Sequence, residues 1–113
     1  MKVIDVYESY FDGECVFHEV ERRAAAVKLT ATSDAGRITY EVSVNFFPHR
    51  DPEDFAVSYD AYASETVYDA PGRRSKKREA ELLGELRPRA ESLAETLGGR
   101  IFWDQPLREA RIG

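Results

Sequence analysis

Residues 75–97, SKKREAELLGELRPRAESLAETL, form the longest stretch of this sequence with helical periodicity. At ~100° per residue, the apolar side chains fall on one stripe of a helix, which contains Leu82, Leu83, Leu86, Ala90, Leu93, Ala94 and Leu97. The glutamates and arginines lie outside this stripe, and two glycines follow, as helices favour just past their last turn. The stretch therefore predicts one long amphipathic helix whose apolar face is buried.

Pro88 lies inside this predicted helix. A proline ring clashes with the carbonyl group four residues earlier, which here belongs to Gly84. Because glycine bends easily, we expect the helix to kink near Pro88 and to continue beyond it.

The residues before this helix alternate between apolar and polar side chains, which is the period of a β-strand. The alternation predicts strands at residues 2–11, 15–20, 25–32, 38–47 and 55–69, joined by turns at Asp12-Gly13, 33–36 and 48–54. A short strand at 100–103 follows the helix, and residues 107–113 give no prediction. The whole chain, 1–113, is predicted to be one α+β domain: a mostly antiparallel meander of about five to six strands with the helix packed on one face.

The composition narrows the class of protein. The single cysteine excludes an internal disulfide framework, and no apolar run is long enough to cross a membrane. We therefore expect a cytoplasmic protein. The net charge of −5 argues against binding of nucleic acid over the whole surface.

The residue types that carry catalysis or bind metals do not form a recognisable group. Cys15 and His18 are three residues apart, so on a strand they point to opposite faces, and His49 is the only other histidine. Neighbouring carboxylates such as Asp12 and Glu14 fall in predicted turns or on polar faces, where solvated acids are normal. The sequence predicts no catalytic residue, no metal site and no cofactor.

Several aromatic residues fall where the strand pattern predicts a polar face. They are Tyr10, Phe47, Tyr62 and Tyr68, and Trp103 lies in the short last strand. Tyrosine and tryptophan tolerate partial burial and are enriched at protein interfaces, so these five residues are candidates for binding a partner. The alternative is an error in the strand register, or a sheet that is covered on both faces.

Five of the sixteen basic residues lie within residues 73–78: Arg73, Arg74, Lys76, Lys77 and Arg78. The dipole at a helix N-terminus favours anions and disfavours cations, so this basic run is a weak candidate for binding an anion. The alternative is a solvated loop that keeps an acidic protein soluble.

These features favour a small non-catalytic interaction or accessory protein. It is expected to bind a protein partner, or a second copy of itself, through an aromatic-bearing face or edge of the sheet. The alternative is a ligand- or anion-binding module with a pocket between the sheet and the helix, lined by Tyr40, Phe46, Phe55 and Tyr59. An enzyme ranks third.

Overall fold

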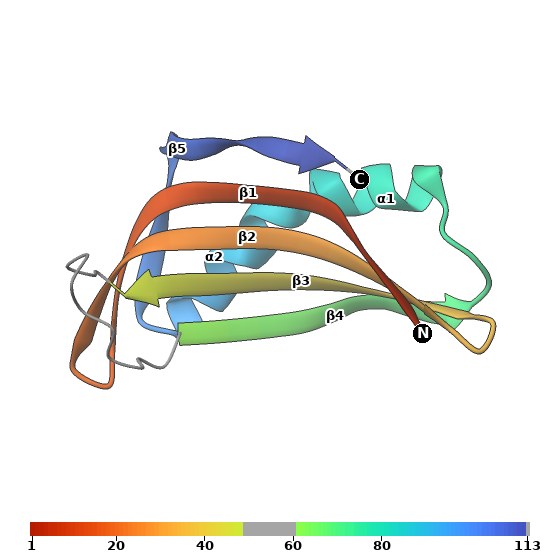
Figure 1. The fold of residues 1–113 in the computed structure, drawn as a ribbon, viewed down its shortest axis with the longest axis horizontal. Coiled ribbons are helices and arrows are strands. Elements are labelled where there is room, and N and C mark those ends of the chain that lie inside the picture. Colours follow the sequence, from red (N-terminus) through yellow and green to blue (C-terminus); the bar gives the residue numbers. More distant parts are fainter. Residues whose placement is uncertain (49–60, 113) are drawn as a thin grey trace.

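The computed structural model describes residues 1–48 and 61–112, which form one antiparallel sheet with helices on one face (Figure 1). The elements are β1 (Lys2–Phe17), β2 (Val20–Asp34), β3 (Arg37–Pro48), β4 (Ala61–Pro71), α1 (Lys76–Gly84), α2 (Leu86–Thr96) and β5 (Gly99–Ile112). The first four strands form a meander, and β5 returns to lie beside β1. The strand order is β4-β3-β2-β1-β5, so β4 and β5 are the two edge strands.

The prediction of one long kinked helix is wrong, because the chain forms two short helices. Glu85 ends α1 and begins α2, and its backbone N–H donates to the carbonyl of Leu82 at 3.1 Å. Pro88 therefore lies in the first turn of a new helix, where a backbone N–H has no intrahelical partner to lose. The predicted apolar stripe is still buried: Leu82, Leu86, Ala90, Leu93 and Ala94 all belong to the core.

The predicted turn at Asp12-Gly13 is also wrong, because β1 runs through it as one strand. The chain turns at His18 and Glu19, whose φ angles are 50° and 64°. Gly13 makes room for a neighbour, since a Cβ atom there would lie 2.9 Å from Cε1 of Phe46. Gly99 on β5 also makes room for this ring, since a Cβ atom there would lie 2.9 Å from Cζ of Phe46. The ring of Phe46 therefore packs against two strands that lack side chains at these points.

The hairpin of β2 and β3 is confirmed. Asp34 pairs with Arg37 across a turn formed by Ala35 and Gly36, both with positive φ. On the predicted strand at 55–69, only the part from Ala61 onward belongs to the described residues, and most of the predicted turn at 48–54 also lies outside them.

The predicted short strand at 100–103 is part of a much longer strand, β5. Its register against β1 passes from Asp12 opposite Phe102 to Phe11 opposite Pro106, so residues 103–105 bulge out of the ladder. Pro106 is tolerated because β5 is an edge strand and needs donors on one side only. The strand bends sharply along its course (Figure 1).

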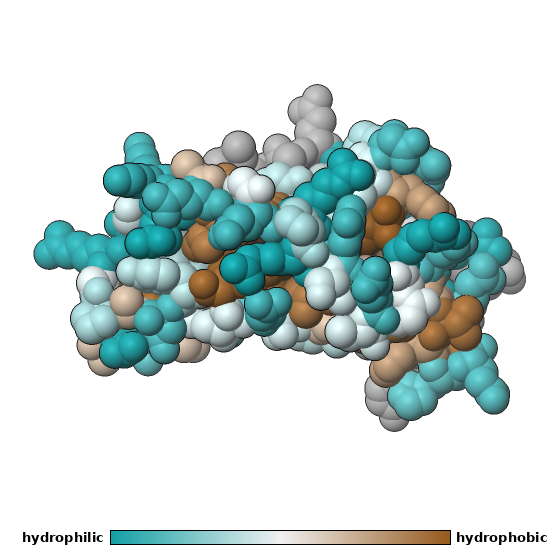
Figure 2. Space-filling view, turned by 180° about the vertical axis from the view of Figure 1, so that it is seen from behind, coloured by the Kyte–Doolittle hydropathy of each residue, from teal (hydrophilic) through white to brown (hydrophobic). Residues whose placement is uncertain are grey.

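The core lies between the sheet and the two helices. The inner faces of β2 and β3 contribute fully buried residues, among them Val27, Leu29, Val42 and Phe46. Seen from the helices, the surface is mostly hydrophilic, with apolar areas between the charged side chains (Figure 2). The helices therefore cover one face of the sheet, and the other face is the one available for side chains of β1 to β4 that do not enter the core.

Candidate protein-binding surface

The strand register places one row of residues across the face of the sheet opposite the helices. Tyr62 on β4 is opposite Asn45 on β3, Asn45 is opposite Ala26 on β2, and Ala26 is opposite Tyr10 on β1. Residues opposite each other in an antiparallel pair point to the same face. Ala26 and Asn45 flank the core residues of their strands, so this row lies on the outer face.

Three of the predicted partner-binding residues lie on this face. The rings of Tyr10 and Phe47 are stacked, with centroids 6.1 Å apart and an interplanar angle of 21°. Tyr62 is diagonal to Phe47, at a spacing that long side chains can bridge. Its side chain is 56% exposed, whereas Tyr10 and Phe47 are half-buried. We call these three residues the outer-face aromatic cluster.

Tyr10 is held in place by charged neighbours. Its hydroxyl donates to Oε1 of Glu8 at 2.7 Å, and Nη2 of Arg108 donates to the same oxygen at 2.9 Å. The Arg108 guanidinium also lies 4.1 Å from the centre of the Tyr10 ring. The hydrogen bond to Glu8 raises the pKa of Tyr10, because it favours the protonated phenol. These contacts hold the Tyr10 end of the cluster, and Tyr62 is its exposed end.

Tyr68 and Trp103 do not belong to this face. The register slips between Tyr40 opposite Tyr68 and Glu41 opposite Thr66, so Val67 is an extra residue and Tyr68 turns toward the core. The prediction that Tyr68 lies on the outer face is therefore wrong. Trp103 packs edge-on against Phe11, with ring centroids 4.9 Å apart.

The outer side of β4 is an open strand edge in the described part of the chain. Between residues 61 and 66 the ladder to β3 is regular, and residues 61–70 contain no lysine, arginine or proline. Both carboxylates of β4 are neutralised by ion pairs within the chain, Glu65 with Arg89 at 2.9 Å and Asp69 with Arg37 at 3.1 Å. Residues 61–66 are called the β4 edge below. Lysines, prolines and bulges are among the features that protect an edge strand, and residues 61–66 have none of these three. The one charged residue of the segment, Glu65, is compensated by Arg89.

The basic run is partly built into the fold. Arg74 donates from Nε and Nη2 to the two carboxylate oxygens of Glu79 at 2.9 and 2.8 Å, and the hydroxyl of Tyr40 donates to the same buried carboxylate at 2.6 Å. The hydrogen bonds from Arg74 hold the pKa of Glu79 below its ordinary value.

The other bases of this run differ in their contacts. Arg78 pairs with Glu81 and lies over the ring of Tyr68. Arg73, Lys76 and Lys77 are exposed. Arg74 and Arg78 therefore anchor α1, which weakens the case for a ligand site made of all five bases.

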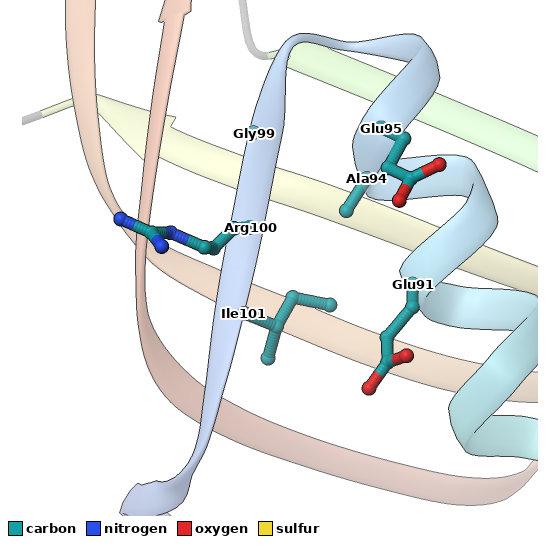
Figure 3. A pocket seen from close by; sticks show the side chains of 6 residues that line it. All are labelled: Glu91, Ala94, Glu95, Gly99, Arg100 and Ile101. Atoms are coloured by element: carbon teal, nitrogen blue, oxygen red, sulfur yellow. The ribbon is translucent and has the colours of Figure 1, made fainter.

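A groove runs between α2 and β5. Two adjoining depressions of about 220 and 350 Å³ share Glu91 and Ile101 in their lining. Figure 3 shows the smaller one, with the carboxylates of Glu91 and Glu95 projecting from α2 on one side and Arg100 turned away from it. These carboxylates repel anions.

The groove is not the pocket that the sequence predicted, because neither Tyr40 nor Phe46 borders it. Tyr40 and Phe46 are fully buried in the core, and Phe55 and Tyr59 lie outside the described residues.

Cys15 and His18 are separated by the fold. The thiol of Cys15 is buried and donates to the carbonyl of Leu97 at 3.1 Å, and burial raises its pKa. His18 lies in the turn after β1, with its ring 4.3 Å from that of Phe17. In residues 1–48 and 61–112 no group of three or more histidine, cysteine or acidic side chains is arranged to hold a metal ion.

No family of proteins, no curated protein sequence and no solved structure matches this chain. Among the described residues, no helix combines the length and the apolar character that crossing a membrane requires.

The sequence predicted binding through a face or an edge of the sheet and named Tyr62, but it did not identify β4 as the edge strand. The segment AYASET, residues 61–66, lies within the predicted strand at 55–69 and contains no lysine, arginine or proline. What the sequence does not reveal is that this strand lies at the border of the sheet, because that depends on where β5 returns.

Proposed function

We propose that this protein is a non-catalytic binding module that takes up a protein partner at β4. The partner adds an extended segment to the β4 edge and packs a side chain against Tyr62 of the outer-face aromatic cluster. The observation that carries this proposal is the regular, unprotected ladder of residues 61–66 at the border of the sheet.

Strand addition uses groups that the β4 edge already offers. On an edge strand, alternate backbone N–H and C=O groups point away from the sheet and can pair with another chain. These main-chain hydrogen bonds supply affinity, and pockets for alternate side chains supply specificity. Tyr62 fits the second role, because its ring is exposed and its hydroxyl tolerates contact with water.

The other residues of the outer face also favour binding of the partner beside β4. Ala24 and Ala26 on β2 have small side chains, so the rings of Tyr10 on β1 and Phe47 on β3 can stack above them. A partner that reaches over β4 therefore meets aromatic surface, with the ion-paired Arg108 and Glu8 at its far border. Polar groups around an aromatic centre are the usual composition of a protein interface.

A photo-crosslinking experiment tests this proposal. Benzoylphenylalanine replaces Tyr62 in one variant and Leu107 on β5 in a matched control, since the two side chains are 56% and 55% exposed. After irradiation in the native cell extract, we expect one discrete protein adduct from position 62 and none from position 107. Equal adducts at both positions, or no adduct at position 62, contradict the proposal.

A further inference from the structure

We infer that the partner at the β4 edge is a second copy of this chain. This inference rests on the proposed function and specifies its partner. The two β4 strands pair antiparallel around a two-fold axis perpendicular to the sheet, so that the two five-stranded sheets become one continuous sheet.

The sequence of the β4 edge selects the register of this pairing. An axis through Ser64 places Tyr62 of one copy opposite Thr66 of the other, and Ala63 opposite Glu65. Pairs of an aromatic and a β-branched residue stabilise neighbouring strands. The whole overlap, residues 62–66, stays within the regular part of the ladder, before the extra residue at Val67.

Other axes fit less well. An axis through Glu65 places this carboxylate opposite its own copy, and like charges directly opposite each other destabilise a strand pair. An axis through Thr66 carries the pairing across Val67, where the strand is irregular. An axis through Ala63 leaves Tyr62 opposite Ser64, without the aromatic and β-branched pair.

Charge does not oppose the approach of two copies at this edge, although each chain carries a net charge of −5. Arg89 bridges Glu65 at 2.9 Å and lies 3.8 Å from Glu85, so the carboxylate next to the axis is compensated within its own chain. In the register around Ser64 it faces the methyl group of Ala63.

The difference between the two edges also explains why the assembly stops at two copies. An open filament requires β4 of one copy to pair with β5 of the next. The bulge at residues 103–105 interrupts the ladder of β5, and Pro106 has no N–H to donate. The β4 edge therefore pairs with a second β4 edge and not with β5. Both β4 edges are used in this pairing, so the assembly is a dimer.

Sedimentation equilibrium with charged residues at position 64 tests this inference. Ser64 is exposed and lies next to its own copy at the axis, so Ser64→Lys and Ser64→Glu each place like charges face to face. We expect a wild-type dimer, and at least a tenfold weaker association for each variant alone. An equal mixture of the two variants restores a heterodimer, because the charges at the axis are then opposite.

Ser92 on α2 is also exposed and provides the matched control. Ser92→Lys and Ser92→Glu leave the dimer unchanged if the interface lies at β4, and circular dichroism verifies that all four variants are folded. A monomeric wild type, a dimer that tolerates both changes at position 64, or a mixture that does not reassociate overturns the inference. A monomeric wild type whose position 62 crosslinks to a different protein would leave the proposed function standing and refute only the choice of partner.

Discussion

The two edges of this sheet differ in the length of regular ladder that each offers to another strand. β4 offers a regular segment without lysine, arginine or proline, and its carboxylates are ion-paired. β5 is longer, but it bulges at residues 103–105, contains Pro106 and carries three arginines. Natural sheets protect the edges that must stay unpaired, so an edge without protection is the better candidate for an interface. This difference supports the proposal that a partner binds at β4.

The largest expected effect concerns α2, which packs across the sheet and supports both edges. Leu93 is 8% exposed and belongs to the core, so Leu93→Ala should lower the free energy of unfolding by ~2–5 kcal/mol through lost burial and a cavity. Glu91→Ala on the solvent side should change it by no more than about 1 kcal/mol, since only an exposed ion pair with Arg87 is lost. Urea titrations measure both, and equal losses would show that α2 does not provide this support.

A second prediction compares the effect on stability of adding a methyl group at two glycines, one packed tightly on β5 and one in open space on α1. A Cβ atom on Gly99 would lie 2.7 Å from Cβ of Cys15 and 2.8 Å from the carbonyl oxygen of Glu14, so Gly99→Ala should destabilise the protein by ~1–3 kcal/mol. Gly84 at the end of α1 has nothing within 4 Å of its Cβ position. Gly84→Ala should leave stability unchanged or raise it by up to ~1 kcal/mol. Thermal unfolding compares the two, and a neutral Gly99→Ala would refute the tight contact between β5 and β1.

A third prediction concerns the β4 side, where Glu79 holds α1 to Tyr40 of β3. Its pKa is lowered from 4.5 by the hydrogen bonds from Arg74, so the stabilisation is present above the unfolded pKa of about 4.5 and is lost as the pH falls toward the lower folded value. Glu79→Gln removes the buried charge that accepts both hydrogen bonds from Arg74 and should cost ~1–3 kcal/mol at pH 7. The difference between wild type and variant should shrink as the pH falls below 4.5. A difference that is constant with pH contradicts this account.

Much of the sheet could be predicted from alternation alone. The hairpin of β2 and β3 was recognisable because the strand at 38–47 alternates without interruption and Gly36 supplies a turn residue. The apolar stripe of the helical stretch was also correct. Local patterns suffice where one face of an element is buried and the other is not.

The errors share one physical cause, which is that tertiary packing overrides a local signal. Gly13 has the sequence of a turn but serves to admit the ring of Phe46. The helix breaks at Glu85, so Pro88 occupies a first turn instead of a kink. A single extra residue at Val67 turns Tyr68 inward, and no sequence pattern within β4 predicts this extra residue. Of the predicted aromatic site, Tyr10, Phe47 and Tyr62 therefore share a face, whereas Tyr68 and Trp103 do not.

Hydrogen exchange of the wild-type protein at increasing concentration distinguishes pairing at β4 from pairing at β5, because it observes both edges in one sample. Amides that point away from an edge strand exchange quickly unless another strand pairs with them. We expect protection within residues 61–66 to rise with protein concentration, while protection along β5 stays constant. Protection that rises equally at both edges, or only at β5, would contradict the assignment of the interface to β4.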